Sequence, residues 1–373
     1  MRILHIVPEL KFGCGVSASV FGSAEAMKNK GHNVFIVLSK IDKMYEFKLK
    51  SLGLPYFIVP VQKDKKNLLD FIKSVAMINT LIREEDIQLI HSHHRWNCLV
   101  GSLCANLNSI ASITSDHNIL YGRKSFSFWS DGVITDSHFN EEHLINYFKV
   151  PKDKIVVIPP LIEKERFSRL LEQKSENNTE SNEFLKFKDK NSFLIGQISR
   201  LSEEKGHEFL IDAIYGILKK NKVVKVLIAG EGDLRKKLTD KLETYGLADN
   251  VLFLGEVTDI VNFLSVLDLF IISSSEEGFC LAATEAILYG LPVIATNVGG
   301  LPEQVINNET GFIVDYGDKI SLEKHITYLL SNGEARKTMG RRGREHLLSM
   351  YSPDNISKKL EEAYEYFQKK CQK

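Results

Sequence analysis

The sequence predicts an α/β protein of two doubly wound domains, whose parallel β-sheets face a cleft between the domains. The chain has 373 residues, which exceeds the length at which one hydrophobic core usually stops growing. Short apolar runs rich in Val and Ile alternate with amphipathic stretches, as in strands that crossover helices bury on both faces. A polar stretch near the middle of the chain separates the two halves.

The apolar runs place the strands of both domains. In the first half, the predicted strands are residues 3–7, 34–38, 57–61, 89–91, 112–114, 132–135 and 155–159. In the second half, they are residues 193–198, 224–229, 251–254, 269–273, 292–295 and 311–314. Helical patterns lie between most of these runs, for example at residues 68–83 and 208–220.

The domain boundaries follow from composition and from helix signals. Residues 171–190 are polar and nearly devoid of strand formers, so we expect them to connect domains at residues 1–170 and 191–352. A Ser-Pro pair that starts at residue 352 reads as the cap and first residue of a C-terminal helix over residues 353–373. We expect this helix to pack back on the N-terminal domain.

Charge and cysteine content narrow the function classes. Lys plus Arg equals Asp plus Glu at 48 each, so no overall positive field attracts nucleic acid, and a charged ligand must be held by a local site. Five scattered cysteines without C-x-x-C spacing suggest neither a disulfide framework nor a zinc ribbon. The N-terminal apolar run is too short for a signal peptide, and nowhere do 18 apolar residues run together. We therefore expect a cytoplasmic protein.

Two loops that follow predicted strands carry residues suited to phosphate. Gly13 and Gly15 precede a helix, where glycines let backbone N–H groups approach an anion, although a plain turn explains them equally well. Arg200 and Lys205 flank another strand-to-helix loop and can neutralise a diphosphate from two directions. A solvated charged loop is the alternative interpretation of that pair.

The segment around residues 277–290 carries the strongest signal. Glu277 lies in a loop before a predicted helix, and Glu285 lies eight residues further on, about two turns inside the helix. Ionised carboxylates only accept hydrogen bonds, which suits the vicinal hydroxyls of sugars and ribose. The intervening residues 278–281 expose N–H groups at the positive end of the helix, which suits phosphate. One element therefore matches sugar, phosphate and ribose.

This segment resembles a known family. Glu277 and Glu285, followed by Gly-Leu-Pro-Val-Ile-Ala-Thr at residues 290–296 and Val-Gly-Gly-Leu-Pro-Glu at residues 298–303, are similar to the signature of retaining glycosyltransferases of family 4. The resemblance covers nearly the whole C-terminal half and, more loosely, the N-terminal half. It implies the GT-B fold, which consists of two Rossmann-like domains.

The resemblance also implies roles for single residues. Arg200 and Lys205, at the family's basic pair, would bind the diphosphate, with help from backbone groups at Phe279, Cys280 and Leu281. Metal is not expected, because no Asp-x-Asp occurs in the chain to hold a metal-bound diphosphate.

Four further assignments follow from the same resemblance. Glu277 would hold hydroxyls of the donor sugar, and Glu285 the ribose of the nucleotide. His117, in Thr-Ser-Asp-His-Asn, resembles the family's cleft histidine near the reacting centre. Gly15 would approach the phosphates or the sugar from the opposite domain.

The chain departs from the family pattern at two places. The usual Gly-Phe-Gly is Gly278-Phe279-Cys280 here, so a small side chain stands where none is usual. The Pro-Asn-Gly that often follows the last strand of the N-terminal domain is Pro-Pro-Leu at residues 159–161.

The histidines of His-Ser-His-His at residues 91–94 raise the question of a metal. A zinc site needs further carboxylate or thiolate ligands at defined spacing, and the sequence has none nearby. On a strand, His91 and His93 point the same way and His94 points the opposite way. We expect these side chains to line the cleft or to have satisfied core roles.

The resemblance implies a retaining glycosyltransferase that moves a sugar from a nucleoside-diphosphate sugar, with UDP as the expected nucleotide, to an acceptor hydroxyl. No cofactor is expected. The expected acceptor is a glycan or a lipid-linked molecule in the assembly of a bacterial surface glycan, such as lipopolysaccharide or capsule. A GT-B-like sugar-nucleotide epimerase or phosphorylase shares the architecture, and a non-catalytic sugar-nucleotide-binding protein is the third reading. The acidic pair Glu277 and Glu285 disfavours an epimerase or phosphorylase. The presence of His117, Lys205 and Glu277 disfavours a non-catalytic protein.

The chain also carries a pattern suited to a membrane surface. Lys63, Lys65 and Lys66 precede an apolar-periodic helix, which suits peripheral contact with anionic lipid at the inner face of the membrane. Packing of that helix on its own sheet is the alternative interpretation.

Overall fold

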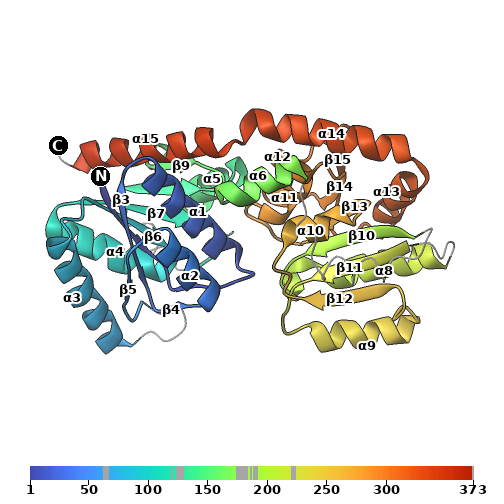
Figure 1. Ribbon diagram of the computed structural model, residues 1–373, viewed down its shortest axis with the longest axis horizontal. Helices are drawn as coiled ribbons and strands as arrows, with labels where there is room; N and C mark the ends of the chain where they lie inside the picture. Colours follow the sequence, from blue (N-terminus) through green and yellow to red (C-terminus); the bar gives the residue numbers. More distant parts are fainter. Residues whose placement is uncertain are drawn as a thin grey trace. The chain divides into compact units, whose positions relative to one another are not determined.

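The structure, a computed structural model, describes residues 1–61, 67–117, 119, 121–122, 130–173, 184, 187, 192–219 and 224–371. The chain divides into two compact units (Figure 1). Unit 1 consists of Met1–Lys164 and Ser352–Lys373, and unit 2 consists of Glu165–Tyr351. Each unit is an α/β domain with a parallel sheet, as predicted.

The sheet of unit 1 has seven parallel strands in the order β5-β3-β1-β6-β7-β8-β9. Their bounds are β1 (Arg2–Ile6), β3 (Asn33–Leu38), β5 (Tyr56–Ile58), β6 (Leu89–His93), β7 (Ala111–Asp116), β8 (Gly132–Thr135) and β9 (Ile155–Val157). The strand order reverses between β1 and β6. In open α/β sheets, ligands bind beyond the carboxyl ends of the strands at such a reversal.

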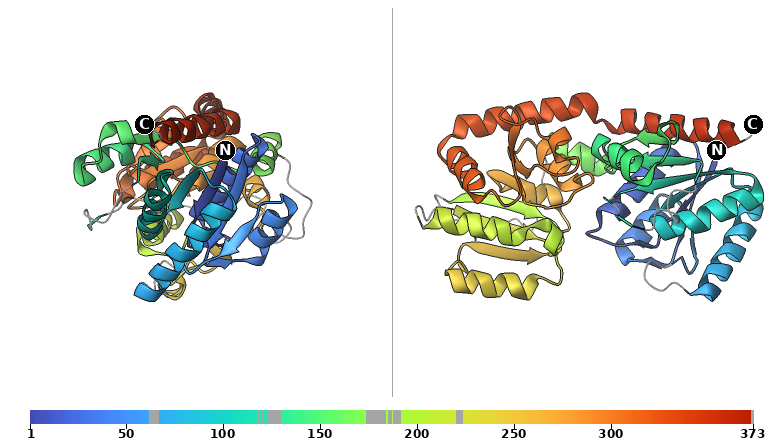
Figure 2. Two further views of the ribbon diagram at one scale, coloured as in Figure 1. Left: turned by 90° about the vertical axis from the view of Figure 1, so that its left-hand side faces the viewer. Right: turned by 180° about the vertical axis from the view of Figure 1, so that it is seen from behind.

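Helices flank both faces of this sheet (Figure 2). They are α1 (Gly15–Asn29), α2 (Lys43–Ser51), α3 (Leu68–Glu84), α4 (Arg95–Asn108) and α5 (His138–His143), which continues into the π-helical segment η2 (Leu144–Phe148). Leu4, Ile6 and Ile90 pack with residues of α3 and α4 in one buried cluster. Because side chains alternate along a strand, His5, His91 and His93 point to the opposite face.

The C-terminal helix α15 (Pro353–Cys371) completes unit 1. The Ser352 hydroxyl accepts a hydrogen bond from the Asn355 backbone N–H, which confirms the predicted serine cap before a first helical proline. Tyr364 and Phe367 are fully buried. A Cβ atom at Gly132 would lie 2.4 Å from the Phe367 ring, so the helix packs directly against the strand backbone.

The sheet of unit 2 has six parallel strands in the order β12-β11-β10-β13-β14-β15. Their bounds are β10 (Phe193–Ile198), β11 (Val224–Ala229), β12 (Val251–Gly255), β13 (Leu269–Ile272), β14 (Val293–Thr296) and β15 (Gly311–Val314). The order reverses between β10 and β13. The loops that follow these two strands are therefore neighbours at one edge of the sheet.

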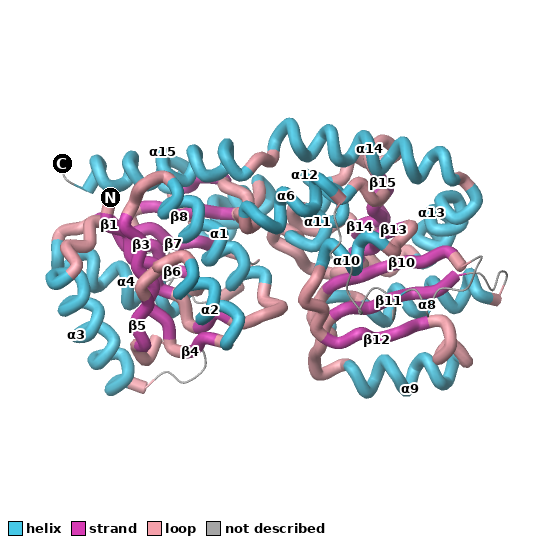
Figure 3. Tube along the Cα trace, in the orientation of Figure 1, coloured by secondary structure: helices cyan, strands magenta, loops and turns pink. Residues whose placement is uncertain are grey.

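Eight helices and one short 3-10 segment are described in unit 2 (Figure 3). They are α6 (Lys164–Glu172), η4 (Glu203–Lys205), α8 (His207–Leu218), α9 (Arg235–Tyr245), α10 (Ile260–Ser265), α11 (Leu281–Tyr289), α12 (Leu301–Gln304), α13 (Lys319–Ser331) and α14 (Gly333–Met350). Side chains of α8, α9 and α13 share one buried cluster with the strands. None of the helices in the described part of the chain is long and apolar enough to cross a membrane.

The first domain boundary lies earlier in the chain than residue 170. Helix α6 belongs to unit 2 from Glu165 onward, because Arg166 pairs with Glu285 and Arg169 pairs with Asp259. The expected connector at residues 171–190 is helical up to Glu172, and most of its remaining residues lie outside the described part of the chain.

Candidate active site

The loops after β10 and β13 bring a basic and an acidic side chain together in unit 2. Lys205 ends the short helix η4, and its Nζ lies 2.8 Å from Oε1 of Glu277. Their side chains are 17% and 10% exposed. The hydroxyl of Ser274 donates to the same carboxylate oxygen at 2.8 Å. The two residues that the sequence assigned to diphosphate and sugar are thus direct partners.

Two glycines with positive φ allow this close packing of loops. A Cβ atom at Gly206 (φ +63°) would lie 1.9 Å from the Ser273 carbonyl oxygen. A Cβ atom at Gly299 (φ +55°) would lie 1.5 Å from the Glu277 carbonyl oxygen. Any larger residue would have to push the loop that carries Glu277 away from its neighbours. Gly299 therefore fixes the backbone of Glu277 from the adjacent strand-to-helix loop.

Arg200 does not join this pair. Its guanidinium lies 3.0 Å from the carboxylate of Glu204, and its side chain is 67% exposed. Glu204 also accepts a hydrogen bond from the Ser202 hydroxyl at 2.7 Å. Burial acts to raise the pKa of Glu204, but the hydrogen bonds it accepts and the charges of Arg200 and Lys205 lower it overall. The expected basic pair is therefore split: Lys205 is largely buried against Glu277, and Arg200 is exposed to solvent beside Glu204.

Helix α11 begins at Leu281, with Cys280 as its N-cap. The Cys280 backbone N–H donates to Oε1 of Gln304 at 3.2 Å, and Nε2 of Gln304 donates back to the Cys280 carbonyl at 3.0 Å. This N–H is thus already bonded within unit 2. Of the backbone N–H groups at residues 279–281 that were predicted to bind phosphate, the one of Cys280 is thus engaged by Gln304.

Glu285 lies one turn inside α11, because the helix starts later than the sequence suggested; the predicted distance of two turns is wrong. The residue is buried, and its Oε1 accepts from a guanidinium nitrogen of Arg166 at 2.9 Å. Arg166 lies 119 residues away in the chain, on α6. No local sequence signal indicated this partner.

Unit 1 carries the other two predicted site residues, Gly15 and His117. Gly15 is the exposed first residue of α1, and Cys14 caps the helix without a side-chain hydrogen bond. The preceding Gly13 has a φ of +70°, as a tight turn into a helix requires. Helix α1 begins after the loop that follows β1, a strand at the strand-order reversal of this sheet.

His117 follows β7, and both of its ring nitrogens have partners. Its Nδ1 lies 3.3 Å from the Asp136 carboxylate, and its Nε2 lies 3.0 Å from Nδ1 of His93. Burial acts to lower the pKa of His117, but the charge and hydrogen bond of Asp136 and the charge of Asp116 outweigh it and raise the pKa above its ordinary value. The side chain is therefore directed into its own unit and fixed at both ends.

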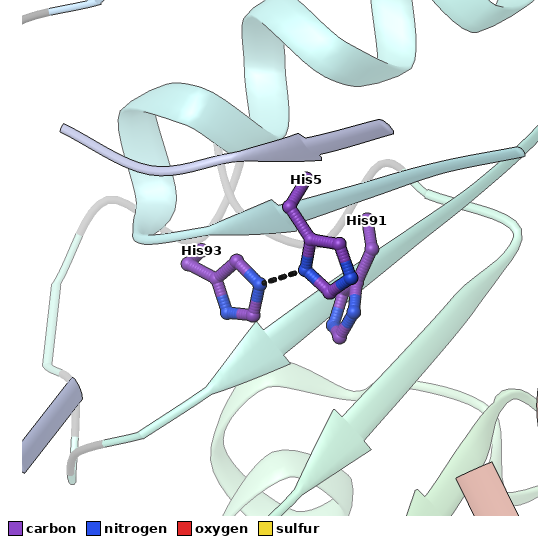
Figure 4. Close-up of side chains that lie close together, drawn as sticks. All are labelled: His5, His91 and His93. Atoms are coloured by element: carbon purple, nitrogen blue, oxygen red, sulfur yellow. Dashed lines mark hydrogen bonds between the residues drawn. The ribbon is translucent and has the colours of Figure 1, made fainter. Parts of the chain in front are cut away.

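His5, His91 and His93 lie together on the face of β1 and β6 opposite to Leu4, Ile6 and Ile90, and all three are buried (Figure 4). They offer ring nitrogens within 4.8 Å of one another, which is a spacing that could suit a metal ion. However, hydrogen bonds already engage five of the six ring nitrogens. The partners of His91 are Tyr364 and Ser115, each at 2.7 Å. We therefore describe the group as a hydrogen-bonded histidine cluster. His94 is outside the strand and caps α4 with a φ of +73°.

Two family models match the chain. The model for glycosyl transferases group 1 matches residues 178–346, and the model for glycosyltransferase family 4 matches residues 14–166. Together they span most of both units, and the acidic pair lies within the first match. The chain belongs to glycosyltransferase family 4. The predicted family and the predicted enzyme class are thereby confirmed.

Known glycosyltransferases resemble this glycosyltransferase over most of its length. The capsular polysaccharide biosynthesis glycosyltransferase CapM of Staphylococcus aureus is 26% identical, over 94% of both chains. A glycosyltransferase structure from Rickettsia africae has a TM-score of 0.83 at 22% identity and covers 98% of both chains. The structure of HepE from Anabaena in complex with UDP-glucose has a TM-score of 0.80 at 20% identity, over 98% of this chain and 100% of that chain. These likenesses confirm the GT-B fold of the family-4 enzyme.

The cysteine that departs from the family pattern is buried in this glycosyltransferase. Cys280 is 7% exposed, and burial, together with the charge of Glu277, raises the pKa of its thiol to about 12. The thiol is therefore a neutral, packed side chain at the start of α11. Leu161, in the Pro-Pro-Leu segment that also departs from the family pattern, is buried at 2% exposed. Its carbonyl oxygen would lie 2.6 Å from a Cβ atom at Gly22.

Proposed function

We propose that this glycosyltransferase moves a sugar from a nucleoside-diphosphate sugar to an acceptor hydroxyl, with retention of the anomeric configuration. UDP is the nucleotide we propose. The observation that carries this proposal is the contact of Lys205 with Glu277, beside the start of α11, at the strand-order reversal of unit 2. Ligands of open α/β sheets bind at such a place.

The contact leaves the two side chains with capacity for a ligand. An ammonium group has three donors, and Glu277 takes one of those of Lys205, so two remain for phosphate oxygens. Oε1 of Glu277 accepts from Lys205 and Ser274, and we assign Oε2 to hydroxyls of the donor sugar. Glu285, whose Oε1 is held by Arg166, is assigned to the ribose. Arg200, exposed beside this group, is a second cation for the diphosphate.

The proposed reaction breaks the bond between the anomeric carbon and the diphosphate oxygen. The acceptor oxygen forms the new bond to the same carbon, and the acceptor proton leaves with the diphosphate. The main cost of this step is the charge on the leaving diphosphate, which fixed cations and N–H dipoles stabilise. We propose that Lys205, Arg200 and the start of α11 supply this stabilisation without a metal ion, since the chain has no Asp-x-Asp to bind one.

The residues of unit 1 complete the proposal. By resemblance to the family, we assign His117 to the reacting centre and Gly15 to the phosphates or the sugar. The HepE structure, which has the same fold, contains UDP-glucose, and CapM is named for capsular polysaccharide biosynthesis. Both names support a nucleotide sugar as the donor and a bacterial surface glycan or its lipid-linked precursor as the acceptor.

We further propose that the enzyme works in the cytoplasm and touches the membrane with the start of α3. Leu68, Leu69 and Ile72 are 73%, 78% and 55% exposed there, whereas Ile78 and Ile82 further along α3 are buried. The start of α3 therefore presents apolar side chains to solvent, whereas Phe71, Val75 and later residues of the helix pack on the core of unit 1. The lysines at positions 63, 65 and 66 lie outside the described residues. Co-sedimentation with anionic liposomes tests this contact, and Leu69→Glu should abolish it; equal binding of the variant would contradict it.

A panel of nucleotide sugars tests the proposed function. A donor that binds the folded enzyme raises its melting temperature by mass action, which identifies the base and the sugar. Incubation of that donor, labelled in the sugar, with glycan and lipid-linked acceptors should move the label to the acceptor in the original anomeric configuration. Label that stays on the nucleotide in an epimerised sugar would indicate an epimerase, and binding without turnover a non-catalytic protein.

A further inference from the structure

Three histidines of unit 1 form a continuous row of hydrogen bonds. Nε2 of His117 lies 3.0 Å from Nδ1 of His93, and Nε2 of His93 lies 3.0 Å from Nδ1 of His5. The rings of neighbouring members are nearly parallel, with interplanar angles of 11° and 8°. Asp136 closes one end of this histidine row, 3.3 Å from Nδ1 of His117. At the other end, Nε2 of His5 is buried and has no hydrogen-bond partner among the residues that the structure describes.

The carboxylate at one end fixes the direction of every hydrogen bond in the row. An ionised carboxylate only accepts, so Nδ1 of His117 carries a proton. If His117 is neutral, its Nε2 accepts from His93, and Nε2 of His93 accepts from His5. If His117 is protonated, its Nε2 donates to His93, and His93 in turn donates to His5. Apart from the proton on Nε2 of His117, the two states differ only in the tautomers of His93 and His5.

We propose that His93 and His5 are positioning residues that let His117 take up and release a proton without the loss of a hydrogen bond. The histidine row thereby sets the pH range in which His117 acts in sugar transfer. This inference rests on the role proposed above for His117 at the reacting centre.

The surroundings of the row favour a single proton that is held at His117. Burial lowers the pKa of His5 to about 3, and burial and the neighbouring histidines lower the pKa of His93 well below its ordinary value. The acidic groups that face the row, Asp136 and Asp116, are both on the side of His117. A proton on the row is therefore most stable at His117, and His93 and His5 stay neutral.

His91 and Tyr364 also face the row but are not members of it. The His91 ring lies 4.3 Å from that of His93, between centroids, and its nitrogens bond to Tyr364 of α15 and Ser115 of β7. Burial and the neighbouring histidines lower the pKa of His91, and burial raises the pKa of Tyr364, so both are neutral. His94, the remaining titratable neighbour of His93, caps α4. A substitution of His91 is thus a matched control for a substitution of His93, because both are buried histidines on β6.

The test is an NMR titration of histidine-labelled full-length protein. In His93→Phe, the Nε2–H of protonated His117 has no acceptor, so we expect its titration midpoint to fall by about one pH unit, since bonds to charged groups are the stronger ones. His93→Asn, whose amide can accept or donate in place of Nδ1, should restore the midpoint to within a few tenths of a unit. His91→Asn should leave it unchanged. An unchanged midpoint in His93→Phe would overturn the inference.

A second variant and a second readout complete the test. If His93→Phe does not fold, His5→Leu removes the far end of the row and should lower the His117 midpoint by about half a pH unit. The pH profile of sugar transfer should shift with the midpoint in each variant. A His117 midpoint that moves while the pH profile of the rate stays fixed would instead refute the proposed role of His117 in transfer. The same His117 midpoint in His5→Leu and wild type would refute the coupling of His117 to His5 through His93.

Discussion

The Lys205 ammonium lies 2.8 Å from the Glu277 carboxylate, although 72 residues separate the two in the chain. The contact follows from the order of the strands, because β10 and β13 are neighbours and each residue lies in the loop after its strand. Gly206 and Gly299 permit the close approach of the loops. Through this pair, the structure joins a predicted phosphate ligand with a predicted sugar ligand.

Lys205→Ala should lower turnover by at least about ten-fold with the fold intact, because a preorganised cation at the leaving diphosphate is lost. Steady-state kinetics with the identified donor measure the effect. Lys237→Ala, which removes an exposed lysine of α9, is the matched control and should behave as wild type. Normal kinetics in Lys205→Ala would remove this residue from the proposed site.

Gly299→Ala should destabilise unit 2 by more than about 1 kcal/mol, because the new Cβ atom meets the Glu277 carbonyl at a positive φ. Gly333→Ala is the control, since Gly333 starts α14, its nearest heavy-atom neighbour is the Arg336 side chain at 3.5 Å, and it has no positive φ. Urea unfolding compares the two variants. Equal midpoints would show that the loop of Glu277 tolerates displacement.

Acid should destabilise unit 2 through His207. Burial lowers the pKa of this histidine to about 4, and its Nε2 bonds to the Ser199 hydroxyl at 3.0 Å. Between pH 6.5 and pH 4 the unfolded chain binds a proton that the folded protein does not, so the free energy of unfolding falls as the pH is lowered. In His207→Gln, the number of protons taken up on unfolding should fall by about one, so the free energy of unfolding should change less between pH 7 and pH 5. Urea titrations at the two pH values measure this difference. A variant as acid-sensitive as wild type would contradict the assignment.

Cys280 should resist thiol reagents in the folded enzyme. A thiol with a pKa of about 12 is ionised to about one part in ten thousand at pH 8, and this one is also buried. The exposed Cys371 should give a fast phase in a thiol-labelling time course, which Cys371→Ser removes and Cys280→Ser does not. Loss of the fast phase in Cys280→Ser would mean that the start of α11 is open to solvent.

The strands were predictable from the sequence because burial on both faces makes a strand an uninterrupted apolar run. Each of the thirteen predicted strands overlaps one in the structure. The strands β2 (Glu9–Leu10) and β4 (Lys40–Ile41) were missed, since two residues cannot show a pattern. The membership of α6 in unit 2 was also missed, because it depends on ion pairs of Arg166 and Arg169 with residues distant in the chain.

The site was predictable only as far as local spacing reaches. The loop positions of Lys205 and Glu277 follow from the strand pattern, but the outward turn of Arg200 depends on its pairing with Glu204. His91 and His93 were expected on one face of a strand. Their meeting with His5 and His117 required the register of three neighbouring strands, which alternation along one strand does not contain. Gln304, which bonds to the Cys280 backbone, carried no signal for the same reason.

Calorimetric titration with UDP and with inorganic pyrophosphate tests the central claim that Lys205, Glu277 and Glu285 share one nucleotide-sugar site. Lys205→Ala should lower the affinity for both UDP and pyrophosphate by ten-fold or more, because it removes a side chain assigned to the phosphates. Glu285→Gln should weaken UDP by a similar factor and leave pyrophosphate unchanged, because its carboxylate is assigned to the ribose. Wild-type affinity for UDP in both variants would place the nucleotide elsewhere and contradict the account.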